Sequence, residues 1–180
     1  MCCARRRVPT STAPRSTSTA ASTCSRSLYP EHQRRTSLDD PAISREARNK
    51  ALVRDKFEAW AQCNGSPFEL LADDASWTIE GGSVASKTYV GRETFLREVI
   101  GPFNARMGVG LKPAIREICA DGDIVVIFFD ARGTARDGKP YANTYFWLFE
   151  MHDGKVTRAS AMFDSIEFND FWSRVAPAEL

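Results

Sequence analysis

The residues best suited to acid–base chemistry stand in the second half of the chain, inside runs of apolar and aromatic residues. Asp130 ends the apolar run of residues 124–129, and Asn143 alternates with Tyr145 and Trp147. A carboxyl group in apolar surroundings has a raised pKa, which suits a general acid or base. Amide and phenol groups can hydrogen-bond an oxyanion that develops beside them. We therefore predict a catalytic group of Asp130, Asn143 and Tyr145.

Each of these three residues also has a structural interpretation. Asp130 could lie at an exposed strand end, paired with Arg132 or Arg136. Asn143 could be a buried side chain whose hydrogen bonds are made by the backbone or by tyrosine hydroxyls. Tyr145 could belong to the plain hydrophobic core.

Aromatic residues near this group are candidates for the wall of a ligand pocket, because they combine a large apolar surface with a polar edge. Phe128 has the strand parity of Asp130, and Trp147 has that of Tyr145. The predicted lining residues are Trp77, Glu80, Tyr89, Phe128 and Trp147. For the two tryptophans the alternative is a place in the core, and for Glu80, which precedes two glycines, it is exposure.

The positions of the histidines and cysteines limit the kinds of catalytic and metal sites that the pocket can contain. His32 stands near the N-terminus and His152 in a predicted turn, so no histidine is left for a Ser-His or Cys-His pair or for a transition-metal site in the pocket. Cys63 and Cys119 are interpreted as reduced thiols, and the other cysteines fall within residues 1–42. We predict neither a metal nor a cofactor.

Charge and hydropathy exclude two classes of partner. The 24 Lys and Arg residues nearly balance the 23 Asp and Glu residues, which argues against a nucleic-acid-binding surface. No apolar run approaches the roughly 20 residues that a membrane-spanning helix needs. The expected partner is a small apolar organic ligand, with no nucleic acid and no membrane.

Residues 1–42 differ in composition from the rest of the chain. They are rich in Arg, Ser, Thr and Pro, and no acidic residue occurs before Glu31. Such a segment cannot bury enough apolar surface to offset the entropy of ordering, so we predict a disordered tail followed by one domain over residues 43–180. We expect a cytoplasmic protein whose start is assigned too far upstream; an organellar transit peptide is the other interpretation of the tail.

The first half of the domain has helical periodicity. Ser44 is a plausible N-cap for a helix whose apolar face carries Val53, Phe57 and Trp60. A helical turn near residues 68–71 and a strand over residues 76–80 follow. A second helix is expected from Gly91-Arg92 to a stop at Gly101-Pro102.

The second half predicts a meander of four long strands. Asp-Gly pairs at residues 121–122, 137–138 and 153–154 separate runs over residues 111–120, 124–132, 141–150 and 155–163. Asp-Gly between strand-forming runs is a strong hairpin signal, because both residues tolerate positive φ. Asp164 with Glu167 then forms a capping box that starts a last helix.

These elements predict an α+β fold. A four-strand antiparallel meander and one short strand would form a cone-shaped, curved sheet, since long strands twist. The N-terminal helices would pack on it and leave an apolar pocket. The outward set Thr144, Phe146 and Leu148 is also largely apolar, and a sheet with two apolar faces is covered on both. A second copy of the chain is the expected cover, giving a symmetric dimer; a monomer with a packed loop over residues 101–110 is the alternative.

Several short motifs resemble the SnoaL-like family of the nuclear transport factor 2-like superfamily, which includes ketosteroid isomerases, limonene epoxide hydrolases and polyketide cyclases. The similarity extends over residues 46–175. The motifs are Trp77-Thr78-Ile79-Glu80-Gly81, Tyr89-Val90-Gly91-Arg92, Gly138-x-x-Tyr141-x-Asn143-x-Tyr145-x-Trp147, Gly154-Lys155-Val156 and Phe163-Asp164.

The resemblance implies only part of the catalytic residues of ketosteroid isomerases and only part of those of limonene epoxide hydrolases. Asn143 falls where ketosteroid isomerases hold a protonated Asp that donates to the oxyanion, whereas their base falls on Ile79, beside Glu80. Asp130 matches one catalytic Asp of limonene epoxide hydrolases, but their second Asp falls on Ala161 and their Arg on Phe128. Neither reaction is inherited as a whole.

The predicted function is that of a cofactor-independent isomerase, dehydratase or cyclase acting on a small apolar carbonyl or hydroxyl compound. Asp130 would move the proton, and Asn143 and Tyr145 would hold the oxyanion. A non-catalytic small-molecule-binding protein, or a dimeric assembly protein of the same fold, is the alternative.

Overall fold

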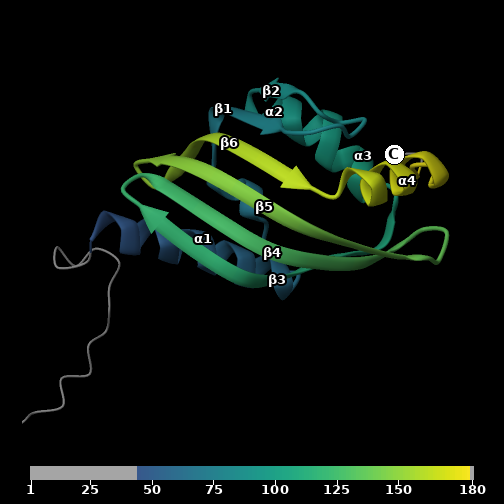
Figure 1. Ribbon diagram of the computed structural model, residues 1–180, viewed down its shortest axis with the longest axis horizontal. Helices are drawn as coiled ribbons and strands as arrows, with labels where there is room; N and C mark the ends of the chain where they lie inside the picture. The colour runs from purple at the N-terminus through teal and green to yellow at the C-terminus, as the bar shows by residue number, and fades with distance from the viewer. Residues whose placement is uncertain (1–43, 179–180) are drawn as a thin grey trace, which may run out of the picture. The chain divides into compact units, whose positions relative to one another are not determined.

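The computed structural model describes residues 44–178 (Figure 1). The tail predicted for residues 1–42 lies outside the described residues, as do residue 43 and residues 179–180. Within the described part of the chain, no helix has both the length and the apolar character that crossing a membrane requires.

The first helix, α1 (Arg45–Ala61), begins at the predicted N-cap. The Ser44 hydroxyl accepts a hydrogen bond from the backbone N–H of Ala47 at 3.2 Å, which satisfies one of the free donors of the first turn. Val53 and Phe57 are buried against the sheet. Figure 1 shows α1 crossing behind β3 (Met107–Asp121) and β4 (Ile124–Ala135), two strands of the sheet that it contacts.

The segment after α1 covers one end of the sheet. It contains the 3-10 helix η1 (Pro67–Leu70), strands β1 (Leu71–Ile79) and β2 (Thr88–Val90), and a helical stretch made of α2 (Arg92–Phe95), the π-helical turn η2 (Leu96–Ile100) and α3 (Gly101–Asn104).

The predicted stop of this helix at Gly101-Pro102 is wrong. Proline lacks the N–H that an interior helical position donates. Here it falls in the first turn of α3, directly after the π-helical turn, where such an N–H has no partner within its own helix. The chain therefore stays helical to Asn104, and Phe103 is carried to the buried side.

The four-strand meander is confirmed. It consists of β3 (Met107–Asp121), β4 (Ile124–Ala135), β5 (Pro140–His152) and β6 (Lys155–Phe163). The glycines of the three Asp-Gly pairs have φ values of 56°, 83° and 74°, in the region that only glycine enters without strain. Local turn chemistry therefore places every hairpin of the meander.

The sheet is mixed, although the α+β class is confirmed. Its strand order is β2-β1-β6-β5-β4-β3, and β1 runs parallel to β6. The parallel pair joins the two ends of the domain, with Trp77 opposite Ala159 and Ile79 opposite Ala161. The sheet is curved, with the helices on one side (Figure 1).

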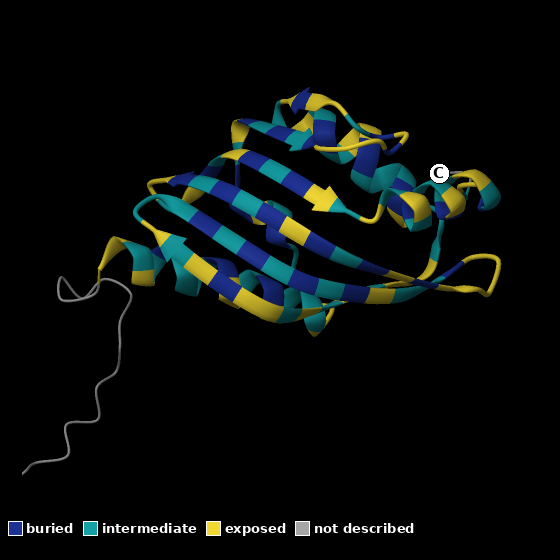
Figure 2. Cartoon of the chain, viewed as in Figure 1, coloured by how far each residue is buried: buried dark blue, intermediate teal, exposed yellow. Residues whose placement is uncertain are grey.

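Burial alternates along the central strands (Figure 2). On β4 the inner residues are Val125, Ile127, Phe129 and Ala131, and on β5 they are Tyr141, Asn143, Tyr145, Trp147 and Phe149. This inner face, together with α1, α3 and the last helix, forms the core.

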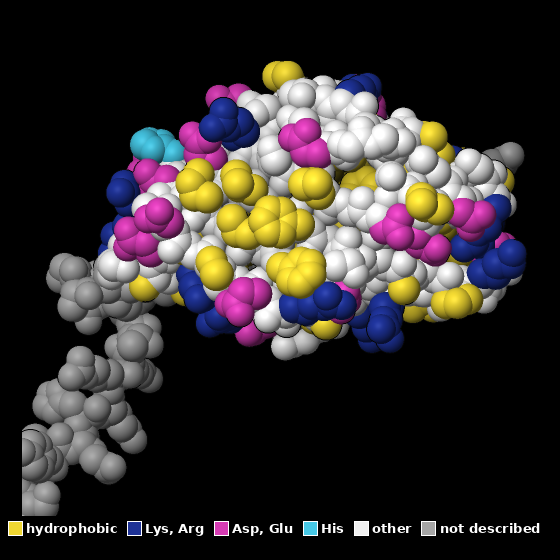
Figure 3. Space-filling view, viewed as in Figure 1, with side chains coloured by type: hydrophobic (Ala, Val, Ile, Leu, Met, Phe, Trp, Pro, Cys, Tyr) yellow, Lys and Arg dark blue, Asp and Glu magenta, His cyan; other side chains and the backbone are white. Residues whose placement is uncertain are grey.

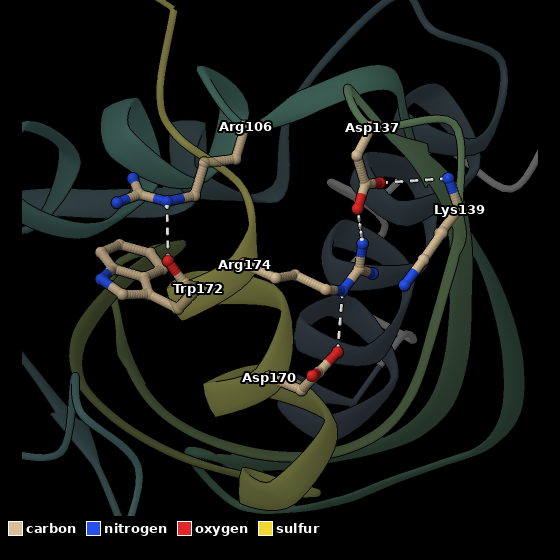
Figure 4. Close-up of polar contacts among 6 residues, drawn as sticks. All are labelled: Arg106, Asp137, Lys139, Asp170, Trp172 and Arg174. Carbon is tan, nitrogen blue, oxygen red and sulfur yellow. Dashed lines mark hydrogen bonds and ion pairs between the residues drawn. The ribbon is translucent and has the colours of Figure 1, made fainter.

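The last helix, α4 (Ser165–Arg174), has Asp164 as its N-cap, as predicted, but the Glu167 half of the predicted capping box is not formed, because the Asp164 N–H donates to the Asn143 carbonyl oxygen. The Asp164 carboxylate accepts hydrogen bonds from the backbone N–H groups of Ile166 and Glu167 at 2.9 and 3.4 Å. Arg174 near its end pairs with Asp137 of the β4–β5 hairpin and with Asp170 (Figure 4).

The start of β3 also holds α4 in place. The Arg106 guanidinium lies 4.2 Å from the centre of the Trp172 ring and donates to the Trp172 carbonyl at 3.3 Å (Figure 4). Further along, the Ala178 N–H donates to the Ala105 carbonyl at 2.8 Å. The closing helix is therefore attached to the sheet at both flanks.

Candidate functional site

A cavity of about 340 Å³ lies between the inner face of the sheet and the helices. This volume suits a small organic ligand, for which pockets of roughly 300–1,000 Å³ are usual. Nine of its 19 lining residues are aromatic: Trp60, Phe68, Trp77, Phe95, Phe103, Tyr145, Trp147, Phe163 and Phe168.

The rings of the wall hold one another in place. Trp77 of β1 stacks on Phe95 of α2, with centroids 4.5 Å apart and planes 12° from parallel. Trp147 of β5 meets the Trp77 ring edge-on at 5.0 Å and lies parallel to Trp60 of α1 at 6.3 Å. Because four elements contribute interlocked rings, the cavity presents flat and rigid apolar surfaces.

The cavity opens to solvent where α1 and α3 end and β3 begins. Its lining residues Cys63, Asn104 and Gly110 are exposed. Cys63 follows α1 with φ of 60°, and its side chain is a free thiol.

The lining includes the polar side chains of Ser66 and Asn104, but the buried hydroxyl among the aromatic rings of the inner wall is that of Tyr145. It lies 3.2 Å from the hydroxyl of Tyr141, which in turn accepts a hydrogen bond from the Asn143 amide nitrogen at 3.1 Å. The same amide donates to the Asp164 carbonyl at 2.9 Å, and the Asn143 carbonyl oxygen accepts from the Asp164 N–H at 2.9 Å. A connected polar chain thus runs from the start of α4 to the cavity.

Burial sets the protonation state of the two tyrosines. It raises the pKa of Tyr145 well above its ordinary value of 10.0, because the phenolate would have little solvent around it. Burial also raises the pKa of Tyr141, although its hydrogen bonds with Tyr145 and Asn143 oppose this shift. Both groups are therefore neutral hydroxyls at physiological pH.

The cavity wall contains no carboxylate, histidine, lysine or arginine among the residues that the structure describes. Nor do the described residues contain a cluster of three or more side chains that could hold a metal ion. The site can surround an apolar body and donate a hydrogen bond. It holds no strong general base.

Asp130 and Phe128 share one face of β4, as predicted, but it is the outer face of the sheet, so the prediction that they line the cavity is wrong. The Asp130 carboxylate accepts hydrogen bonds from Thr144 Oγ1 and Arg116 Nε, each at 2.7 Å. The Thr144 hydrogen bond and, after it, Arg116 hold the pKa of Asp130 below its usual value. Phe128 packs against the Arg116 guanidinium, whose central carbon lies 5.0 Å from the centre of the Phe128 ring.

The prediction chose the wrong face of β4 for a physical reason. Residues 124–129 are apolar on both faces of β4, so alternation alone does not distinguish inside from outside. The register with β5 decides it, since Phe129 lies opposite Tyr145, and Asp130 opposite Thr144.

Glu80 and Tyr89 do not line the cavity either. Glu80 is exposed just after β1. Tyr89 lies on the inner face of β2, is 4% exposed, and packs beside Phe95. Its hydroxyl donates to the Ala85 carbonyl at 2.7 Å, so its polar end is used within the core.

Of the predicted residues, Tyr145, Trp77 and Trp147 line the cavity, and Asn143 lies behind it as the support of Tyr141. Sequence reasoning missed the helical contribution, which comes from Trp60, Phe68, Phe95, Phe103 and Phe168. Their helical spacing marks them as inward-facing. Only the packing of the helices shows which of them border an empty space.

Two other hollows are less suited to an organic ligand. A groove of about 410 Å³ between α1 and β3 is bordered by the exposed charged residues Arg54, Glu58, Arg116 and Glu117. A cleft of about 300 Å³ on the outer face surrounds the Asp130–Arg116 ion pair. Neither is enclosed by aromatic side chains.

A curved mixed sheet with helices packed around an apolar cavity is the architecture of nuclear transport factor 2-like proteins, and solved structures of this class match the chain. A nuclear transport factor 2-like protein of unknown function from Burkholderia pseudomallei matches at 20% identity with a TM-score of 0.58, over 69% of this chain and 97% of its own. TerC, co-crystallised with polyporic acid, matches at 22% identity and 0.57, over 69% and 98%.

A proposed SnoaL-like polyketide cyclase from Jannaschia sp. is similar as well, with 19% identity and a TM-score of 0.56, over 73% of this chain and 96% of its own. The family model of the SnoaL-like domain matches residues 46–159. The chain therefore belongs to the SnoaL-like family. No curated protein sequence matches it.

Proposed function

We propose that this protein binds a small, flat, largely apolar compound in the aromatic cavity and hydrogen-bonds its carbonyl or hydroxyl oxygen through Tyr145. The observation that carries the proposal is a cavity of about 340 Å³ walled by interlocked rings, with a single buried hydroxyl among them. Apolar walls supply affinity, and one placed polar group supplies orientation.

In this proposal Asp130 does not act on the ligand. A carboxylate on the outer face cannot reach a ligand on the inner face, and its hydrogen bonds to Thr144 and Arg116 favour the ionised form. The isomerase or dehydratase mechanism predicted from the sequence needs a base beside the ligand, and the cavity wall supplies none. Binding is therefore the function that the geometry supports best.

A cyclase is the second candidate. An intramolecular addition to a carbonyl needs a template that folds the substrate and a donor that polarises the carbonyl oxygen. The rigid aromatic wall would act as the template and the neutral Tyr145 hydroxyl as the donor, with the nucleophile supplied by the substrate. The similarity to a proposed polyketide cyclase supports this candidate.

A thermal-shift screen of the full chain tests the binding proposal. The compounds would be aromatic ketones, quinones, phenols and steroids, and a ligand at a hundred times its Kd should stabilise the protein by about 2.7 kcal/mol. Ala161, which is 1% exposed and lines the cavity, would be changed to Phe to fill the space. We expect Ala161→Phe to lose the shift and Asp130→Asn to retain it.

The opposite pattern would overturn the proposal. If Asp130→Asn abolished the shift and Ala161→Phe left it intact, the ligand would bind on the outer face. For hits carrying a carbonyl, product analysis with Tyr145→Phe as the control distinguishes a cyclase from a binding protein, because a binding protein returns the compound unchanged.

We also propose a symmetric dimer through the outer face of the sheet. Phe146 and Met162 are paired neighbours there, 42% and 54% exposed, and Figure 3 shows hydrophobic side chains gathered at the centre of this face. The pairs Arg116–Asp130 and Arg158–Glu150 bring both charge signs to the same face. A second copy rotated by 180° can therefore match apolar to apolar and cation to anion.

Sedimentation velocity on the full chain tests the dimer. Met162→Lys puts a charge in the centre of the proposed interface and should give a monomer. Ile166→Lys is the matched control, because Ile166 is 81% exposed on α4, away from the sheet face, and this variant should stay a dimer. A wild-type protein that sediments as a monomer at micromolar concentration would contradict the proposal.

We place the protein in the cytoplasm, with an organellar transit peptide in residues 1–42 as the other candidate. Imaging of a fluorescent fusion of the full chain separates the two, since a transit peptide would direct the fusion to an organelle.

A further inference from the structure

We infer that Asn143 and Tyr141 fix the direction in which the Tyr145 hydroxyl points its proton. The cavity would then bind ligands whose oxygen only accepts hydrogen bonds, such as ketones or quinones, more tightly than the corresponding alcohols. The inference rests on the proposed function, namely that the cavity binds an organic ligand. It narrows the ligand from a carbonyl or hydroxyl compound to a carbonyl compound and makes Tyr141 and Asn143 positioning residues.

The first step is the orientation of the Asn143 amide. Its oxygen accepts from the Asp164 N–H at 2.9 Å, and its nitrogen donates to the Asp164 carbonyl at 2.9 Å. This two-point contact with the backbone allows one amide orientation, because the flipped amide would place oxygen against oxygen. The second N–H of the amide is thereby directed at the Tyr141 hydroxyl, 3.1 Å away.

The second step is the direction of the Tyr141 hydroxyl. Tyr141 is fully buried, so its proton cannot be satisfied by solvent. Its oxygen already accepts from Asn143, and the Tyr145 oxygen lies 3.2 Å away. A buried donor without a partner is unfavourable. Of the two tyrosines only Tyr145 lines the cavity, where a ligand can accept its proton, so Tyr141 donates to Tyr145.

The third step concerns the proton of Tyr145. Its oxygen accepts from Tyr141, and no other hydrogen-bond partner lies near this hydroxyl among the described residues. The ring is enclosed by Phe129, Trp147 and Phe163, none of which offers an oxygen. The O–H is therefore left to donate to a ligand in the cavity.

Carbonyl and alcohol ligands then differ in how well their oxygen fits beside the Tyr145 hydroxyl. A carbonyl oxygen accepts the Tyr145 proton and leaves no polar group unpaired. An alcohol oxygen can accept the same bond, but its own proton would then need an acceptor close to Tyr145, and the rings of Phe129, Trp147 and Phe163 that enclose this residue offer none. Tyr145 could accept that proton if the hydrogen bonds from Asn143 through Tyr141 to Tyr145 all ran in the opposite direction. The Asn143 amide would then have to accept from Tyr141, and its contacts with Asp164 prevent this.

The test compares 9-fluorenone with 9-fluorenol on the full chain by calorimetry. The two compounds share a flat tricyclic body and differ in the oxygen. We expect the ketone to bind about tenfold tighter, the usual effect of one unpaired polar group, and Tyr145→Phe to bring the two affinities close together. Equal affinities in the wild type, or tighter binding of the alcohol, would overturn the inference. Failure of both compounds to bind would instead count against the proposed function.

Two further variants test the positioning role. Asn143→Asp replaces the donor toward Tyr141 by an acceptor, which reverses the chain and should shift the preference toward the alcohol. Because this variant also disturbs the Asp164 contact, Tyr141→Phe provides a second measurement. Donation from Tyr141 strengthens the Tyr145 O–H as a donor, and a stronger donor lowers the carbonyl stretching frequency of bound fluorenone further. The frequency in Tyr141→Phe should therefore lie between those of the wild type and of Tyr145→Phe. A frequency equal to that of the wild type would contradict this role.

Discussion

At the scale of single residues, the two faces of β4 and β5 separate two kinds of polar chemistry. Neutral hydroxyl and amide groups lie on the inner face, where hydrogen bonds join Asn143 to Tyr141 and Tyr141 to Tyr145. The ionised pair Asp130–Arg116 lies on the outer face. Burial explains the division, because a charge inside an aromatic cavity would lose its hydration.

The outer-face carboxylate predicts a particular pH dependence of stability. The pKa of Asp130 is lowered in the folded protein, first by the Thr144 hydrogen bond and then by Arg116. Its stabilising effect is therefore present above the unfolded pKa of about 3.9 and is lost as the pH falls through the lower folded pKa. We expect Asp130→Asn to have a smaller free energy of unfolding than the wild type at pH 7, and the difference to narrow below about pH 4.

Urea titrations at pH 7 and at steps below pH 4 measure this effect. Asp74→Asn is the control, since Asp74 is exposed on β1, and its difference from the wild type should be small throughout. A difference for Asp130→Asn that stays constant down to the lowest pH would show that the substitution acts through packing and not through the charge.

At the scale of elements, the long hairpin of β3 and β4 depends on one glycine. The pairing shifts register twice between Met107 and Lys112 of β3, and Gly133 of β4 lies opposite this irregular stretch. A Cβ added to Gly133 would meet the Val109 carbonyl oxygen at 2.6 Å and the Gly110 carbonyl oxygen at 3.1 Å. Both atoms belong to the backbone, so the neighbouring strand would have to move.

We therefore expect Gly133→Ala to lower the free energy of unfolding by about 1–3 kcal/mol, the usual range for forced overpacking. Gly110→Ala is the matched control in the same hairpin, because a Cβ there meets no atom within 4 Å. Chemical unfolding of both variants measures the difference. Equal stability of the two would mean that β3 yields without loss of its pairing. Gly110 also borders the cavity, so ligand binding should be measured alongside.

At the scale of the whole molecule, the outer face of the sheet links stability to association. If two copies pair through Phe146 and Met162, the folded dimer is favoured by mass action and its Tm depends on protein concentration. We expect Tm to rise when the concentration is increased a hundredfold, and Met162→Lys to abolish this rise. Differential scanning calorimetry at two concentrations measures it, and a wild-type Tm independent of concentration would argue for a monomer.

The sequence alone determined the elements that depend on local chemistry. Ser44 and Asp164 act as N-caps as predicted, and the three Asp-Gly pairs place the hairpins of the meander. The alternation of Tyr141, Asn143, Tyr145 and Trp147 sets one face of β5. Each of these signals lies within a few residues of the feature that it predicts, so no distant contact was needed to interpret it.

Tertiary structure alone decided which side of β4 faces the ligand and where the empty space lies. Residues 124–129 are apolar on both faces, so their direction follows from the register with β5, and Asp130 is carried outward with Phe128. The parallel pairing of β1 with β6 brings Trp77 to the inner wall, where Phe95 and Trp147 pack against it. A cavity is the volume that packed elements leave unfilled, and that volume depends on contacts between residues far apart in the chain.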